Sequence, residues 1–518
     1  MNILHINGND LTLEELGQVI YERRPVILEP QARQAVEKAR AVVDDLVERD
    51  LVAYAITTGV GQLSDVRISG EQVRELQINL VRSHAVGVGE PLSEHESRAM
   101  MLLRANSLAK GYSGVRPVII DTLCEMLNRG VHPVIPSQGS VGASGDLAPL
   151  AHLAAALIGE GEAIFEGRKV TGAEAMKMAE IKPVTLAAKE AISLINGTQA
   201  MLAVGCLALL KAETLANTAD VVGAISLDAL KGTNVAFDER IHRVRPHSGQ
   251  LTVAANLRLL LEDSELRASH RDCGRVQDAY SLRCMPQVHG AVRDTLAYAR
   301  SVFEVEMNSA VDNPLVFIEP RKVGAKPAPA GQAPLGDILS GGNFHGQPLA
   351  FALDFVAIAL SALAGISERR LERLVNPALS EGLPAFLAPG AGLNSGFMMP
   401  QVTAAALVSE NKVWAHPASV DSLTTSGNKE DYVSMGMTSA NKLKRVVTNT
   451  TNVLAIEALA GAQAVDILAP LKPSKPCQTA LAAIRAVSPM MAKDRSLAPD
   501  FAKVAGVIAS GEIAKVLQ

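Results

Sequence analysis

The longest segments of this chain are rich in alanine and leucine, and several of them exceed 20 residues. In a globular protein, apolar segments of this length form helices rather than strands. Long helices that follow one another along a chain are typical of a bundle whose members run nearly antiparallel. The segments are residues 199–230, 248–261, 286–307, 346–374 and 402–412. We therefore predict a mainly α-helical fold with a central bundle of long antiparallel helices.

The composition supports a globular protein with an aliphatic core and excludes two classes of partner. Of the 518 residues, 48% are hydrophobic, 20% are charged and only 3% are aromatic, so a large core can be buried. The formal net charge of −5, with scattered lysines and arginines, gives no basic patch for nucleic acid or an anionic membrane. The most apolar segment, residues 348–365, is interrupted by Asp354, and no uncharged apolar run reaches the roughly 18 residues of a membrane span.

The cysteines and the N-terminal residues indicate a cytoplasmic protein. The five cysteines are far apart and show no CxxC spacing, which fits reduced thiols in the cytosol. The N-terminal sequence MNILHINGNDLTLEEL lacks the basic region and the apolar stretch of a signal peptide. His242 and His247 lie five residues apart with no third ligand in view, so we predict no metal site.

The pattern along the chain predicts two domains. Residues 1–198 combine shorter helical segments, such as residues 30–48, with two loops that contain glycine, at residues 53–67 and 132–149. Residues 199–518 hold the helical bundle and the C-terminal helices. Within this second domain, residues 319–337 are rich in proline, alanine and glycine, which indicates a flexible exposed loop between two helices.

The sequence GSVGASGD, residues 139–146, is the most unusual segment of the first domain. A phosphate-binding loop would need Gly-Lys-Ser/Thr at its end, but Asp146 follows Gly145. A nucleophile elbow centred on Ser144 would need glycine at position 146. The simplest interpretation is a glycine-rich turn in which Ser144 or Asp146 caps the following helix.

A second interpretation of the same segment is chemical, because Ala143-Ser144-Gly145 suits backbone cyclisation. In this reaction the Gly145 nitrogen attacks the Ala143 carbonyl carbon, and glycine permits the close approach because it has no Cβ. Loss of water from the ring, and loss of the Ser144 hydroxyl with an α-hydrogen, leaves an exocyclic methylidene on a 4-methylideneimidazol-5-one ring. This group is a strong electrophile of a kind that no ordinary side chain supplies.

The segment resembles the electrophile loop of the histidine and phenylalanine ammonia-lyase family, in which an Ala-Ser-Gly followed by Asp forms this ring. Five further segments resemble motifs of the family in the same order, so the resemblance extends from about Thr12 to Ser510. These segments are residues 54–61 (YAITTGVG), 194–198 (LINGT), 277–284 (QDAYSLRC), 312–315 (DNPL) and 342–345 (GNFH). The resemblance implies an ammonia-lyase that needs no external cofactor.

The resemblance also implies a role for individual residues. Tyr54 corresponds to the base that removes the β-proton of the substrate while its amine adds to the methylidene, and its phenolate must be favoured by neighbours. Arg283 corresponds to the residue that binds the substrate carboxylate with its planar guanidinium. Further candidates are Asn196, Gln277 and Tyr280, which hydrogen-bond the carboxylate or the ring, and Phe344, which packs near the ring.

Two positions bear on which amino acid is the substrate. The pair Ser83-His84 and the distal Glu410 resemble the histidine-directed members, and His84 and Glu410 can pair both nitrogens of an imidazole. We therefore predict the conversion of L-histidine to trans-urocanate and ammonia. Val60 replaces the phenylalanine that the family usually carries beside the base, which leaves a tyrosine or phenylalanine lyase open.

The sequence also leaves open an aminomutase of the same family and a catalytically inactive scaffold or binding homologue. By resemblance, the protein forms a homotetramer in which each active site combines loops from three subunits. Besides further copies of the chain, we expect only the small amino acid substrate as a partner.

Overall fold

The computed structural model describes residues 2–49, 51, 53, 56, 58–59, 68, 72–319 and 335–517. Tyr54 and most of the predicted exposed loop 319–337 lie outside the described residues. The chain divides into two compact units. Unit 1 comprises Met1–Leu207, Ser301–Leu353 and Ala418–Asn441, and unit 2 comprises Ala208–Arg300, Asp354–Pro417 and Lys442–Gln518. The boundary at residue 198 stays a prediction, but three segments beyond it, 199–207, 301–353 and 418–441, belong to unit 1.

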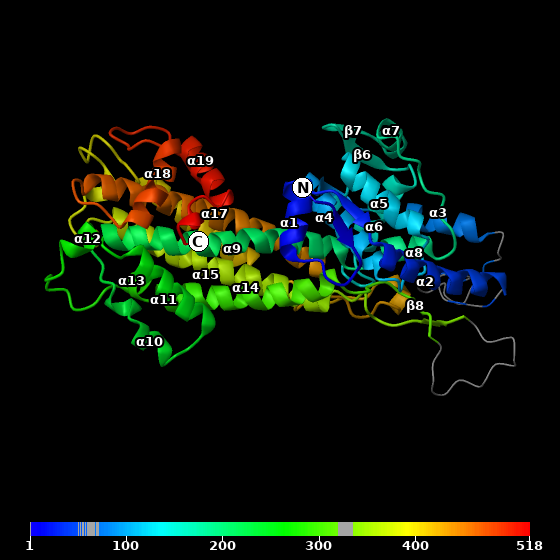
Figure 1. Cartoon of the computed structure of the whole chain (residues 1–518). Coiled ribbons are helices and arrows are strands. Elements are labelled where there is room, and N and C mark those ends of the chain that lie inside the picture. The colour runs from blue at the N-terminus through cyan, green and yellow to red at the C-terminus, as the bar shows by residue number, and fades with distance from the viewer. Residues whose placement is uncertain are drawn as a thin grey trace. The chain divides into compact units, whose positions relative to one another are not determined.

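Unit 1 is built mainly of helices, the first of them blue to cyan in Figure 1, and α1, α2 and α5 pack against the buried helix α4. Ser93 and Glu96 form a capping box at the start of α4, and nearly every residue from Glu96 to Ala109 is buried. The first helix is also capped as its sequence indicates, because Thr12 and Glu15 form a second capping box. The helices of this unit are α1 (Leu13–Tyr21), α2 (Pro30–Glu48), α3 (Val73–His84), α4 (Glu94–Ala109), α5 (Pro117–Arg129), α6 (Leu147–Leu157), α7 (Gly172–Met178) and α8 (Glu190–Ile195).

The strands of unit 1 are short, and each belongs to a sheet of two or three strands. β1 (Leu4–Ile6) pairs in parallel with β2 (Val26–Leu28), and β3 (Val88–Pro91) pairs antiparallel with β5 (Pro136–Gln138). β6 (Glu162–Phe165) lies between β4 (His132–Pro133) and β7 (Arg168–Thr171), and β8 (Leu315–Phe317) pairs with β9 (Asp337–Leu339). The β3–β5 pair matters for the site because β5 leads directly into the loop at residues 139–146.

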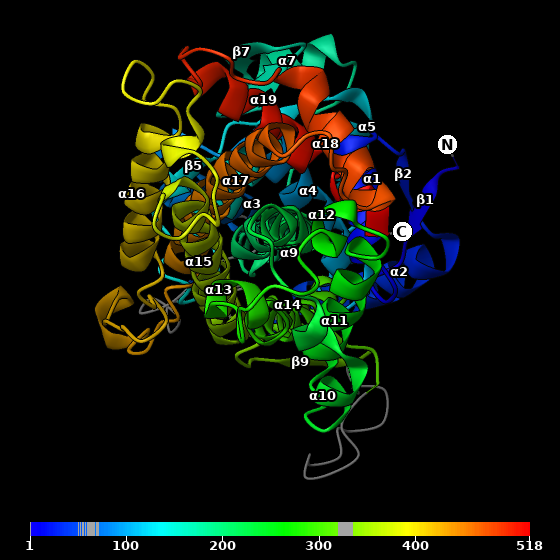
Figure 2. The ribbon, with the colours of Figure 1, turned by 90° about the vertical axis from the view of Figure 1, so that its left-hand side faces the viewer.

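Unit 2 is built on long helices, and α9 lies at their centre with α14, α15 and α17 around it (Figure 2). The elements that lie wholly or partly in unit 2 are α9 (Gln199–Ala229), α10 (Glu239–Arg243), α11 (Ser248–Leu260), α12 (Glu265–Ala268), α13 (Tyr280–Arg283), α14 (Met285–Met307), α15 (Gln347–Val375), α16 (Met398–Trp414), α17 (Gly436–Ile467), α18 (Lys475–Val487), α19 (Ala498–Ala509) and the short helices Val235–Phe237, Ala385–Leu387 and Ala514–Leu517.

Hydrogen bonds between the long helices fix their directions. From α9 to α14, the pairs Asp220–His289, Asn217–Arg293 and Glu213–Arg300 advance in opposite senses, so these helices are antiparallel. From α15 to α17, the pairs Asp354–Lys442 and Arg370–Glu457 advance together, so these helices are parallel. The mainly α-helical fold with a bundle of long helices is confirmed. A long connection between α15 and α17 allows these two helices to run parallel.

Two of these helices, α9 and α15, are apolar and long enough to cross a membrane by length and composition alone. Most of each apolar window is buried inside the fold, as expected of core helices. Asp354, which interrupts the most apolar segment, accepts a hydrogen bond from Lys442 Nζ at 3.0 Å. The ion pair offsets part of the free-energy cost of burying either charge alone.

Candidate active site

The loop at residues 139–146 connects β5 to α6, and two of its glycines leave no room for a side chain. Gly142 and Gly145 both have a φ of +70°, a region that side chains disfavour. A Cβ on Gly145 would lie 2.1 Å from the Gly197 carbonyl oxygen, and one on Gly142 would lie 2.1 Å from Ser434 Oγ. Only glycine therefore fits at either end of the Ala143-Ser144 pair.

The turn between α8 and α9 holds the loop from one side. Asn196 Nδ2 donates to the Ser144 carbonyl oxygen at 3.2 Å, and the Asp146 backbone amide donates to the Gly197 carbonyl oxygen at 2.7 Å. Asn196 Oδ1 is buried and accepts no hydrogen bond from the described residues. A buried amide oxygen of this kind is costly unless a ligand donates to it, so a bound molecule with an N–H or O–H group fits beside Ser144.

The segment 425–436 holds the loop from the other side and contributes a carboxylate that the sequence-based predictions missed. Glu430 Oε1 accepts a hydrogen bond from Ser144 Oγ at 2.8 Å, and Glu430 Oε2 accepts one from Thr425 Oγ1 at 2.6 Å. The Met435 amide donates to the Val141 carbonyl at 2.9 Å. None of the segments that the sequence analysis singled out contains Glu430, which lies in the polar stretch GNKEDY at residues 427–432.

Asp146 anchors the loop to the start of α9. Its carboxylate accepts hydrogen bonds from the Met201 backbone amide at 2.8 Å and from Ser140 Oγ at 2.7 Å, where the helix dipole also favours a negative charge. The side chain is fully buried, and this burial raises the pKa of the Asp146 carboxyl to about 6 in spite of these hydrogen bonds. In the unfolded chain the same carboxyl has a pKa near its ordinary value.

The raised pKa of Asp146 predicts a pH dependence of stability. The folded state holds the Asp146 proton more tightly than the unfolded state does. The contribution of this carboxyl to the free energy of unfolding is therefore greatest below pH ~4, and it falls by on the order of 3 kcal/mol as the pH rises towards ~6. Asp146→Asn removes this loss. We expect the difference in Tm between the two proteins to shift in favour of the variant over this pH range, as measured by thermal unfolding at several pH values. A difference that does not change with pH contradicts the prediction.

Two other predicted residues, His84 and Phe344, belong to segments in which a nearby glycine contacts this loop or its neighbour Ser434. His84 ends α3, where its Nδ1 lies 2.8 Å from the Leu80 carbonyl oxygen. Three residues later, Gly87 packs against Gly139 of the loop. Phe344 is half-buried, and its neighbour Gly346 packs against Ser434, which donates to the Gly142 carbonyl at 3.2 Å. Both therefore stay candidates for contacts with a bound ligand.

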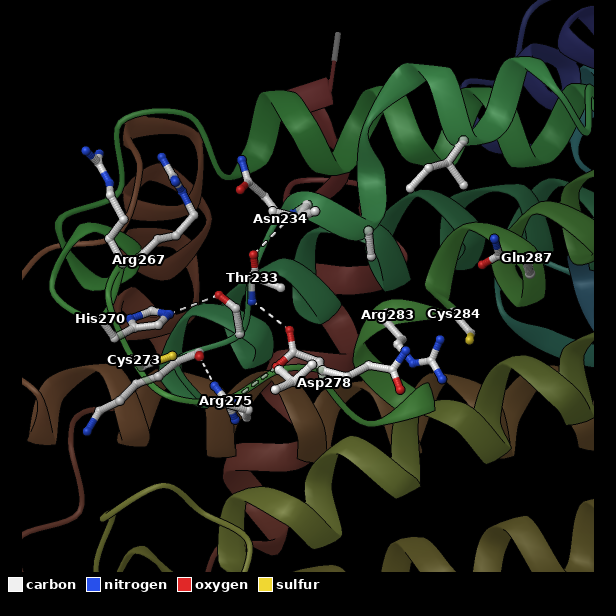
Figure 3. Close-up of a pocket in the computed structure, with 18 residues that line it drawn as sticks. Thr233, Asn234, Arg267, His270, Cys273, Arg275, Asp278, Arg283, Cys284 and Gln287 are labelled. Atoms are coloured by element: carbon white, nitrogen blue, oxygen red, sulfur yellow. Dashed lines mark hydrogen bonds and ion pairs between the residues drawn. The ribbon is translucent and has the colours of Figure 1, made fainter.

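Three of the remaining candidates lie together in unit 2. Gln277 and Arg283 line a cavity of about 560 Å³ whose wall also includes His270, Cys273 and Asp278 (Figure 3). The guanidinium of Arg283 lies 4.4 Å from the centre of the Tyr280 ring, in a cation–π arrangement. Gln277 and Tyr280 are exposed, and the exposed fraction of Tyr280 is 71%. The cavity thus offers a planar cation beside hydrogen-bonding groups, as carboxylate binding requires.

Glu410 lies on α16, also in unit 2. It is exposed and accepts a hydrogen bond from Asn449 Nδ2 at 2.6 Å. Its pairing with a substrate imidazole stays a prediction. Glu430 is the carboxylate that the structure places on Ser144.

Comparison with known proteins agrees with this fold. The sequence model of the aromatic amino acid lyase family matches residues 11–486. A histidine ammonia-lyase of Koribacter versatilis (strain Ellin345) is 72% identical over 99% of both chains. The crystal structure of a histidine ammonia-lyase from Trypanosoma cruzi matches with a TM-score of 0.90 and 42% identity, over 100% of this chain and 95% of that one. A tyrosine aminomutase from Streptomyces globisporus matches with a TM-score of 0.90 and 40% identity, over 99% and 98%.

The helical bundle, the constrained Ala-Ser-Gly loop and these relationships define a carbon–nitrogen lyase. The chain belongs to the aromatic amino acid lyase family. The family resemblance that its motifs indicated is thereby confirmed.

Proposed function

We propose that this protein converts L-histidine to trans-urocanate and ammonia. The observation that carries the proposal is the hydrogen bond of Ser144 Oγ to Glu430, within a loop whose flanking glycines leave no room for side chains. The full-length relative at 72% identity is named as a histidine ammonia-lyase, whereas the aminomutase match is at 40% identity. These relationships favour histidine elimination over an aminomutase and over a phenylalanine or tyrosine lyase.

We further propose that Ala143-Ser144-Gly145 closes into the 4-methylideneimidazol-5-one ring and that no external cofactor is needed. The residues fit this group, because Gly145 lies against the Gly197 carbonyl in a position that only a residue without a Cβ can occupy, and Ser144 Oγ, the leaving oxygen, has an acid–base partner in Glu430. The ring supplies an electron-poor methylidene carbon towards which electrons of the substrate can move. Asn196 donates to the Ser144 carbonyl, which the ring retains, and this hydrogen bond withdraws electron density.

Other residues of this chain transfer protons and bind the substrate. Glu430 lies beside the Ser144 side chain, so its carboxylate is placed to accept a proton from a substrate group that arrives there. Tyr54, outside the described residues, stays our candidate for the base that removes the β-proton. Arg283, with Gln277 and Tyr280 beside it, binds the substrate carboxylate. His84 and Phe344 contact the substrate side chain and the ring.

We propose that several copies of the chain assemble around shared sites, as a homotetramer. Exposed candidates such as Tyr280 and Gln277 need a cover before they can work in a site from which water is excluded. Unit 2 also carries a groove of about 760 Å³ between α14 and α15, lined by the exposed apolar side chains Tyr298, Phe355 and Ile358. A face of this kind is typical of an interface between protein chains. We place the protein in the cytoplasm because its cysteines, all within the described residues, form no disulfide.

Product analysis tests the substrate assignment. We expect the purified protein to release ammonia and urocanate from L-histidine, and to act on L-tyrosine and L-phenylalanine at least ~10-fold more slowly, because an apolar ring leaves the polar groups of an imidazole site unpaired. Ultraviolet absorbance separates urocanate from cinnamate-type products. A β-amino acid product indicates the aminomutase instead, and the absence of any product from all three indicates the inactive homologue.

A further inference from the structure

Arg104 is a buried cation beside the candidate active site, and the proposed mechanism does not use it. It lies in the interior of α4 with no solvent exposure. Its guanidinium donates to the Asn196 carbonyl oxygen at 3.0 Å, to Gln199 Oε1 at 2.7 Å and to the Ser193 carbonyl oxygen. The three acceptors lie in α8, in the turn that follows it and at the first residue of α9, so Arg104 ties together the segment 193–199.

Burying the Arg104 guanidinium is costly in free energy because its hydrogen-bond partners are uncharged. Its hydrogen-bond acceptors in the described residues are two carbonyls and one amide, all uncharged, and the carboxylate of Asp312 acts on it only from beyond hydrogen-bond distance. Burial lowers the pKa of Arg104 to about 10. A buried cation held only by neutral acceptors does little for stability, so its position requires another reason.

The turn that Arg104 holds also binds the loop at residues 139–146. Asn196 Nδ2 donates to the Ser144 carbonyl, and the Gly197 carbonyl both accepts from the Asp146 amide and packs against Gly145. Contact with Arg104 is tight, because a Cβ on Gly197 would lie 2.3 Å from Arg104 Nη1 and 2.5 Å from Gln199 Oε1. The position of the guanidinium therefore sets the position of Gly197, and Gly197 in turn limits where Gly145 can move.

We propose that Arg104 is a positioning residue for ring formation: it fixes the turn from Ser193 to Gln199 so that Gly145 is pressed towards Ala143. This inference rests on the proposed function. In the closure, the Gly145 nitrogen bonds to the Ala143 carbonyl carbon, and that carbonyl oxygen leaves as water with the hydrogens of the Gly145 and Ser144 amides. Ser144 Oγ leaves as a second water with its own hydrogen and the Ser144 α-hydrogen, and no oxidant or reductant takes part.

Arg98 provides a matched control within the same helix. It is also fully buried and also donates to neutral acceptors, the Val19 carbonyl oxygen at 2.7 Å and the Leu127 carbonyl oxygen at 3.1 Å. Burial lowers the pKa of Arg98 to about 10 as well. Arg98 binds the ends of α1 and α5 instead of the loop, so the two arginines differ in what they hold.

The experiment compares Arg104→Lys with Arg98→Lys by intact mass, followed over time in newly synthesised protein. A lysine keeps the charge but loses the planar fork that reaches three acceptors at once. We expect Arg104→Lys to slow the loss of two waters on the order of tenfold or more, while Arg98→Lys keeps the wild-type rate. Both variants should lower the Tm by similar amounts, so a purely structural role for Arg104 predicts equal maturation in both.

Two results overturn the inference: maturation of Arg104→Lys at the wild-type rate, or an equal delay in Arg98→Lys. If Arg104→Lys is insoluble, Gln199→Met removes one acceptor and should slow maturation about fivefold, and an unchanged rate in that variant overturns the inference as well. A wild-type protein that never loses two waters refutes the proposed ring itself. That failure is visible in the wild-type sample alone, whereas failure of the Arg104 role is visible only in the variants.

Discussion

Ser144→Ala is expected to reduce turnover of L-histidine by at least about a thousandfold, because without Oγ no methylidene can form. The variant should stay folded. The Ser144 hydroxyl donates one hydrogen bond, to Glu430, and loss of such a bond costs only about 1 to 3 kcal/mol. Steady-state assays of urocanate formation measure the first effect, and thermal unfolding measures the second.

A matched serine shows whether the loss is specific to position 144. Ser309 also lies in unit 1, and its Oγ donates to the Val305 carbonyl oxygen in the helix α14. Ser309→Ala should keep full turnover and an intact fold. Substantial residual turnover in Ser144→Ala, or an equal loss in Ser309→Ala, contradicts the assignment of Ser144 as the source of the electrophile.

Glu430→Gln is expected to produce the second largest effect, a fall in kcat on histidine of about 10²- to 10⁴-fold. The amide keeps the size of the side chain and can still accept a hydrogen bond from Ser144 Oγ, but it no longer accepts a proton from a substrate group. Intact mass should be recorded for the same preparation, so that a loss of turnover in mature protein is separated from a failure to mature. Wild-type kcat in mature Glu430→Gln refutes the role of this carboxylate.

Glu410→Gln should be compared with Glu430→Gln, because the sequence favoured Glu410 as the carboxylate that recognises the imidazole of the substrate. If it does so in the assembled protein, Glu410→Gln lowers activity on histidine more than activity on phenylalanine. Comparison of kcat/KM on both amino acids tests this expectation. An equal loss on both substrates counts against Glu410 as a specificity residue and leaves Glu430 as the candidate.

Much of the helical architecture could be predicted from periodicity and from helix-capping signals. The predicted helix at residues 30–48 is α2, and the segments 199–230, 248–261 and 286–307 correspond to α9, α11 and α14 within one residue at each end. Periodicity did not reveal the 32-residue α17, whose first half is rich in threonine and asparagine, residues with low helix propensity. Tertiary packing stabilises this helix where its local sequence does not. The two- to four-residue strands were too short to leave an alternating pattern.

The candidate site was predicted where its chemistry follows local sequence and was missed where it follows from distant contacts. Ala143-Ser144-Gly145 carries its own signal in three adjacent residues. Glu430 lies 286 residues from Ser144 along the chain, and no local pattern reports that proximity. Arg104 is equally hidden, because an arginine within a helix usually lies on a solvated face. The sequence predicted antiparallel helices, as α9 and α14 are, but not the parallel pair α15 and α17, whose directions depend on the long connection between them.

The central claim is that three consecutive residues of the mature chain have become an electrophilic heterocycle. Intact-mass spectrometry of freshly purified wild-type protein, followed by proteolysis to isolate the peptide that contains residues 139–146, tests it most directly. We predict that the chain is lighter than its encoded sequence by two waters and that the whole deficit lies in that peptide. The full encoded mass, or a deficit located elsewhere, would contradict the account.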